Sequence, residues 1–157
     1  MTSPRFASYR SMVLVACGLM LASCTHDTYQ ERANLIKNHT DAFYNNLKAN
    51  RVESSIRNNE QIETLASQMG DTVRKRAGQQ GTTHVEREFA LMNTANEAAA
   101  TNWLALGQYF TIKHQYPQAR ATYRRVIDTY TNSTDRPYRE QALRALKDLD
   151  MLNPPTT

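Results

Sequence analysis

Apolar side chains recur with helical spacing from about residue 29 to residue 77. Most are three, four or seven positions apart, which is typical of helices with one buried and one solvent-facing side. Polar residues interrupt the series at Asn50-Arg51 and at Asn58-Asn59. The region therefore predicts two helices, or one long helix with a polar break, and Asn59 at a core position weakens a coiled-coil interpretation. The apolar residues are Ile36, Phe43, Leu47, Ile56, Ile62, Leu65, Met69 and Val73.

A strong helix breaker, Gly78-Gln79-Gln80-Gly81, separates this region from a second helical one. Thr83 with Glu86 three residues later forms a capping box, which predicts that a helix restarts there. A turn is predicted at 132–135, and Pro137 opens a last helix that ends at Asn153-Pro154-Pro155. The apolar residues of that last helix are Tyr138, Ala142, Leu143, Leu146 and Leu149. Glycine and proline occur five times each in 157 residues, and this scarcity supports an all-α fold.

Residues 103–123 contain a Trp-x2-Leu-Gly-x2-aromatic pattern followed by Ala-x3-aromatic. This pattern resembles a tetratricopeptide repeat, although Val126 and Thr131 replace the Ala and Pro that the family often has. The resemblance implies an antiparallel helix-turn-helix solenoid of about one to two repeats with a C-terminal capping helix. A step of 34 residues makes 85–96 the second helix of a degenerate earlier repeat. The signature residues are Trp103, Leu106, Gly107, Phe110, Ala119 and Tyr123, with the two small ones expected where the helices cross closely.

In this family the first helix of each repeat lines a concave groove that binds partner polypeptides. The resemblance therefore implies a groove formed by Thr101, Leu104, Gln108, Thr111 and Ile112. A second interpretation stays open, in which Leu104 and Ile112 pack against a neighbouring helix.

The first residues have the pattern of a secretory signal, with Arg5 and Arg10 before an apolar run from Met12 to Met20. Leu21-Ala22-Ser23-Cys24 then resembles the lipobox of bacterial lipoproteins. The resemblance implies cleavage before Cys24 and lipidation of that residue, and Thr25 in place of Asp favours sorting to the outer membrane, facing the periplasm. An uncleaved membrane span is the alternative, but the apolar run falls well short of the roughly 20 residues it needs.

These patterns divide the chain into five segments. They are a signal peptide (1–23), an N-terminal helical region (24–77), a loop (78–83), a repeat-like helical domain (84–152) and a tail (153–157). Removal of the signal peptide would lower the formal net charge of +4 by two and leave Cys24 as the single cysteine, so no internal disulfide is expected.

Basic residues concentrate between residues 113 and 147, where three acidic residues, Asp128, Asp135 and Glu140, oppose eight basic ones. This stretch suits either an anionic partner, such as lipid headgroups or an acidic protein face, or an ordinary solvated surface. Nucleic acid is not an expected partner in the periplasm. The basic residues are Lys113, Arg120, Arg124, Arg125, Arg136, Arg139, Arg144 and Lys147.

Catalytic and metal-binding patterns are weak in this sequence. Its four histidines are scattered, and no serine lies in a Gly-x-Ser-x-Gly elbow. His84 and Glu88 are four residues apart on one expected helix, but two ligands do not make a zinc site. We therefore expect no enzymatic activity, no metal and no cofactor.

The sequence as a whole predicts a membrane-anchored adaptor that binds another envelope protein, as an accessory or pilotin-like lipoprotein of a secretion, pilus or outer-membrane assembly machine. The alternative is a self-assembling spacer, a homo-oligomer in which residues 29–77 pair with copies of themselves. If this region formed one continuous helix, it would extend for about 70 Å.

Overall fold

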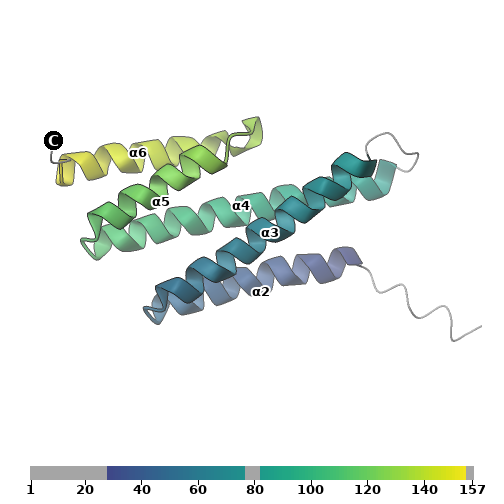
Figure 1. Ribbon diagram of the computed structural model, residues 1–157, viewed down its shortest axis with the longest axis horizontal. Helices are drawn as coiled ribbons and strands as arrows, with labels where there is room; N and C mark the ends of the chain where they lie inside the picture. The colour runs from purple at the N-terminus through teal and green to yellow at the C-terminus, as the bar shows by residue number, and fades with distance from the viewer. Residues whose placement is uncertain (1–27, 77–81, 155–157) are drawn as a thin grey trace, which may run out of the picture.

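The computed structural model describes residues 28–76 and 82–154 of the chain. Every regular element in these two ranges is helical, which confirms the all-α prediction (Figure 1). The elements are α2 (Thr28–Lys48), α3 (Val52–Arg76), α4 (Thr82–Ile112), α5 (Tyr116–Thr129), the short 3-10 helix η1 (Ser133–Asp135) and α6 (Arg136–Leu152). None of these helices has the length and apolar character that a membrane crossing requires.

The first expected polar break is a sharp turn between α2 and α3. Asn50 has a φ of 56°, and the N–H of Arg51 donates to the carbonyl of Asn46 at 2.9 Å. This geometry closes a helix with a left-handed residue, a conformation that asparagine tolerates. The chain then reverses, and α3 packs against α2. The prediction of two helices is confirmed, and the single 70 Å spacer helix is wrong.

The second expected break, at Asn58-Asn59, lies inside the continuous helix α3. Asn59 is fully buried, and its side-chain amide donates to the carbonyl of Ala99 on α4 at 3.0 Å. It also accepts a hydrogen bond of 2.9 Å from the side chain of Asn102. A polar residue occupies the core position here because the facing helix supplies hydrogen-bond partners.

Helix α4 runs without interruption for 31 residues. The segment 85–96, which the 34-residue step made into a separate second helix, is the first half of the helix that carries Trp103. That part of the repeat prediction is wrong. No glycine or proline interrupts residues 97–103, and the alanines of this stretch favour a continuous helix.

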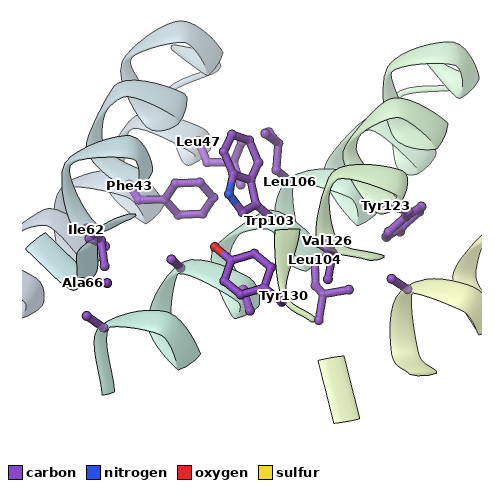
Figure 2. Packing of buried hydrophobic residues seen from close by; sticks show 14 of the residues in the cluster. Phe43, Leu47, Ile62, Ala66, Trp103, Leu104, Leu106, Tyr123, Val126 and Tyr130 are labelled. Atoms are coloured by element: carbon purple, nitrogen blue, oxygen red, sulfur yellow. The ribbon is translucent and has the colours of Figure 1, made fainter. Parts of the chain in front are cut away.

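Helix α4 is also the centre of the fold, since it contacts α2, α3, α5 and α6 (Figure 1). The amino-terminal hairpin of α2 and α3 packs along it, and α5 and α6 cover its carboxyl-terminal half. Figure 2 shows the ring of Trp103 at the centre of the core, with side chains of the amino-terminal hairpin on one side and of α5 on the other.

The crossing of α4 and α5 has the close contact that the sequence led us to expect. Gly107 lies directly against Tyr123, and a Cβ atom at position 107 would come within 2.5 Å of the Tyr123 ring. Ala119 is fully buried. The turn between these helices contains His114 at a φ of 57°, with the N–H of Gln115 donating to the carbonyl of Phe110 at 2.8 Å. It is the same type of turn that joins α2 to α3.

Candidate functional site

The five residues predicted to line a groove do not all lie on an open surface. Thr101, Gln108 and Ile112 are exposed, and Ile112 retains 68% of its accessible surface. Leu104 is buried and belongs to the core, as the second interpretation allowed for it. Thr111 is half-buried, and its hydroxyl donates to the carbonyl of Gly107 on its own helix at 2.9 Å. We call Thr101, Gln108 and Ile112 the α4 strip.

The six repeat-signature residues lie in the interior of the fold. All six are buried, and the ring of Phe110 packs edge-on against that of Tyr109. They therefore hold α4 and α5 together and offer little surface to a partner. These residues are Trp103, Leu106, Gly107, Phe110, Ala119 and Tyr123.

A pocket of about 370 Å³ lies between the carboxyl-terminal ends of α2 and α4. The hydroxyl of Tyr109 donates to Oδ1 of Asn50 at 2.9 Å, which links α4 to the α2–α3 turn. The ammonium of Lys113 lies 5.6 Å from the centre of the Tyr109 ring, within reach of a cation–π interaction. The pocket is lined by Tyr44, Leu47, Lys48, Asn50, Tyr109 and Lys113. Sequence periodicity gave no sign of this pocket, because it forms only when the two helix ends meet.

Glu63 of α3 is the centre of a polar cluster that sequence analysis missed. Its Oε1 accepts hydrogen bonds from the indole of Trp103 at 2.7 Å and from the hydroxyl of Tyr130 at 2.8 Å. Its Oε2 accepts one from Arg125 at 2.8 Å. Burial, and then the negative charge of Glu63, raise the pKa of Tyr130, so this hydroxyl remains a donor. The cluster ties α3 to α4 and α5.

Three of the eight basic residues of the stretch, Arg120, Arg125 and Arg136, form ion pairs with described residues. Arg125 binds Glu63 and lies 3.9 Å from the centre of the Trp103 ring, and Arg120 binds Asp150 at 2.7 Å. Arg139 donates to two backbone carbonyls, those of Tyr130 and Asn132. Of the three arginines expected on a solvated surface, Arg124 is exposed, Arg125 is half-buried with a partner on α3, and Arg120 is the most buried, with a partner on α6.

The remaining basic residues of the stretch lie at the surface. Arg136 binds Glu140 at 2.6 Å, and this contact lowers the pKa of the Glu140 carboxyl. Arg124, Arg144 and Lys147 are exposed. Lys113 is exposed as well, and none of these four forms an ion pair with a described residue, so four basic side chains of the stretch remain available to an anionic partner.

The residues weighed as metal ligands have other contacts. Glu88 is buried and binds Arg32 of α2, while His84 lies beside Arg76 at 3.1 Å. Across residues 28–76 and 82–154, no three His, Cys, Asp or Glu side chains gather as metal ligands would. Cys24 and the segments 1–23, 78–81 and 155–157 lie outside the described residues.

Comparisons with known proteins find no matching family model, no matching curated protein and no matching solved structure.

Proposed function

We propose that the chain is a lipid-anchored adaptor of the bacterial envelope, and that it binds another envelope protein along the α4 strip. The observation that carries the proposal is the exposure of this strip on a helix that four others contact. Ile112 is an exposed branched aliphatic side chain beside the polar Gln108, a combination that suits a moderate protein interface. The pocket with Lys113 follows directly at the end of the strip.

The arrangement of the helices supports a tetratricopeptide-like interpretation of this surface. The α2–α3 and α4–α5 hairpins turn through equivalent left-handed residues, Asn50 and His114. Each helix contacts the next one along the chain, and α4 contacts both α2 and α6. In a solenoid of this kind the first helices of successive hairpins, here α2, α4 and α6, share one face. Such a face would place the α4 strip in the middle of a groove.

The anchor in this proposal is Cys24, four residues before α2 begins. Lipidation there would hold the helices close to the outer membrane on the periplasmic side. Confinement to a thin layer raises the effective concentration of a partner that is itself in or near the membrane, so that a weak groove is sufficient. Tethering needs no catalytic group, metal, cofactor or nucleic acid. A pilotin-like or other accessory role in a secretion, pilus or assembly machine would use the same mechanism.

The experiment that tests this proposal is photo-crosslinking in cells from the mature chain. A photoreactive amino acid replaces Gln108 on the strip, and the matched control replaces Arg124, an exposed residue of α5. Arg125 would be a poor control because it binds Glu63. Adducts are identified by mass spectrometry, and a Cys24→Ala variant shows whether capture depends on the anchor.

One dominant heterologous adduct from position 108, absent from position 124, is the expected result. Adducts between copies of the chain would instead favour a self-assembling spacer. Equal capture from both positions would rule out the α4 strip as the binding surface.

A further inference from the structure

The described part of the chain has two buried carboxylates, and they differ in one respect. Glu88, 4% exposed, forms an ion pair of 2.5 Å with Arg32. Asp135, 5% exposed, forms no ion pair with any described residue. Its carboxylate forms the capping box of η1 with Asn132, and its Oδ1 is not one of the fully enclosed atoms that lack a partner, so Oδ1 stays accessible to solvent or to a ligand.

The hydrogen bonds that Asp135 accepts leave half of its carboxylate unused. Both end on Oδ2, and both come from Asn132, whose backbone N–H lies at 3.3 Å and side-chain amide at 3.1 Å. Within the described ranges no hydrogen bond ends on Oδ1. The nearby Arg139 donates to backbone carbonyls, and the amino-terminal end of α6, which begins at Arg136, gives only partial compensation.

Asp135 lines a pocket with a volume of about 430 Å³. The pocket walls are α3 on one side and the α5–α6 connection on the other, with Met92 and Asn96 of α4 between them. Ala66, Ser67 and Gly70 are small, which keeps the α3 wall open.

Two of the three charged residues that line this pocket, Glu63 and Asp135, are carboxylates, and the third is Arg74. The oxygens of Glu63 already accept hydrogen bonds from Trp103, Tyr130 and Arg125, so the acceptors left for a ligand are Oδ1 of Asp135 and the amide oxygen of Asn96. The cation in the lining is Arg74, which is bound to Asp71 and has a side chain 72% exposed. Met92 and the ring of Tyr130 supply apolar contact for a methylene chain. The pocket thus combines a buried acceptor with a narrow apolar wall.

We propose that this pocket binds an arginine side chain of a partner polypeptide, with the guanidinium on Oδ1 of Asp135. A guanidinium is planar and donates several hydrogen bonds at once, so it can reach the carboxylate and the oxygen of Asn96 together. A metal ion is a poorer match, because the described residues provide no group of three acidic, His or Cys ligands. The site lies on the α3 side of α4, away from the α4 strip, and requires neither the strip nor the anchor.

The test uses the full chain, purified in a mild detergent and labelled with ¹⁵N. N-acetyl-arginine amide is titrated, and N-acetyl-citrulline amide, which has the same shape without the charge, is the matched probe. The readouts are the backbone amide of Gly70 and the side-chain amide of Asn96. The variants are Asp135→Asn, the pocket-filling Ser67→Trp, and Asp148→Asn, an exposed control on α6.

We expect saturable shifts at Gly70 and Asn96 with the arginine probe, and none with citrulline. Binding should weaken at least about tenfold in Asp135→Asn and in Ser67→Trp, and should be unchanged in Asp148→Asn. Ser67 is exposed, so this variant reports on the pocket even if Asp135→Asn unfolds. The absence of shifts, equal shifts with citrulline, or equal loss in Asp148→Asn would overturn the proposal. None of these outcomes bears on the crosslinking test of the α4 strip.

Discussion

Helix α4 packs against α3 and α5 through two interfaces of opposite chemistry. Towards α3 it uses buried amides, with Asn102 donating to Asn59 and Asn59 donating to the carbonyl of Ala99. Towards α5 it uses close apolar contact, with Gly107 directly against the ring of Tyr123. Asn59 and Asn102 are at most 1% exposed, and Tyr123 is 5% exposed. One helix can therefore join its neighbours by hydrogen bonding on one side and by shape on the other.

The different chemistry of the two interfaces also explains why the sequence predicted the α4–α5 interface and not the α3–α4 interface. Small and aromatic residues at fixed spacing form a recognisable pattern, so the α4–α5 hairpin was predicted from Gly107, Ala119 and Tyr123. Buried asparagines have no such signature, since asparagine is far more common at surfaces and turns. Asn59 was consequently interpreted as a break in a helix whose core it occupies.

The strongest test of the polar interface replaces Asn59 with leucine. Asn59→Leu leaves the amide of Asn102 buried without a partner, and we expect the free energy of unfolding to fall by about 3 kcal/mol. Urea unfolding followed by circular dichroism measures it. Oδ1 of Asn102 has no hydrogen-bond partner among the described residues even in the native chain.

The matching double variant, Asn59→Leu with Asn102→Leu, removes both polar partners. Because no amide is then left buried, it should recover to within about 1 kcal/mol of the native chain. A double variant no more stable than the single one would show that the interface depends on shape and not on paired amides.

The apolar interface is tested by adding one methyl group to Gly107. A Cβ atom there meets three atoms of the Tyr123 ring at 2.5–2.8 Å, so Gly107→Ala should cost about 2 kcal/mol through overpacking. The matched control is Gly70→Ala at the α3–α4 interface, where the nearest atom is the flexible Sδ of Met92 at 3.3 Å. Gly70→Ala should be neutral or stabilising by up to about 1 kcal/mol, because alanine favours helix. Equal destabilisation of both variants in urea would contradict the distinction.

Alkaline pH tests Tyr130, whose hydroxyl lies just after α5 and donates to Glu63 of α3. Its pKa is raised in the folded chain by burial and by Glu63, so above about pH 10 the unfolded chain loses this proton first. Stability from this group is therefore complete below about pH 10 and decreases above it, by about 1.4 kcal/mol per pH unit.

The comparison that isolates this effect is Tyr130→Phe, which should unfold with a shallower pH dependence between about pH 10 and pH 12. Tyr138, with a pKa raised to about 12 by burial and Glu97, should contribute less, so Tyr138→Phe provides a graded control. An unchanged slope in Tyr130→Phe would show that its proton is lost equally in both states.

The smallest effect is expected at the α2–α3 turn and the α4–α5 turn, which are of the same type. His114 adopts a left-handed φ of 57°, where glycine carries no steric penalty. His114→Gly should raise the free energy of unfolding by about 0.5 kcal/mol, after the loss of its contact with Tyr116. Asn50→Gly should be less favourable because it removes the acceptor of Tyr109. Thermal unfolding of the two variants side by side gives the ranking.

Helix identity and the outer boundaries of the fold were largely predictable. The breaks near residue 50 and at 132–135, and the position of the last helix, follow from local signals of turn and helix formation. The continuity of α4 was not predicted, because a 34-residue step back from Ala119 and Tyr123 made 85–96 a separate helix. A repeat period assumes equal helix lengths, and α4 is more than twice as long as α5, at 31 residues against 14.

The candidate sites were less predictable than the fold. Exposure of Gln108 and Ile112 agrees with their helical positions, but Leu104 is buried because α4 has a neighbour on that side as well. Glu63 and Arg125 take their roles from residues 40 or more positions away, and Asp135 takes its role from a pocket that several elements share. Spacing along one helix contains no information about such contacts.

The unbroken α4 gives the molecule a single rigid axis. At 1.5 Å per residue its 31 residues extend for about 46 Å, and α2, α3, α5 and α6 all pack against it. A tilt of the α2–α3 hairpin is passed on to α5 and α6, because α4 has no break between them and Glu63 links α3 directly to Arg125 of α5. The protein is thus built as a lever, and the orientation in which one end is held sets the direction in which the other end points.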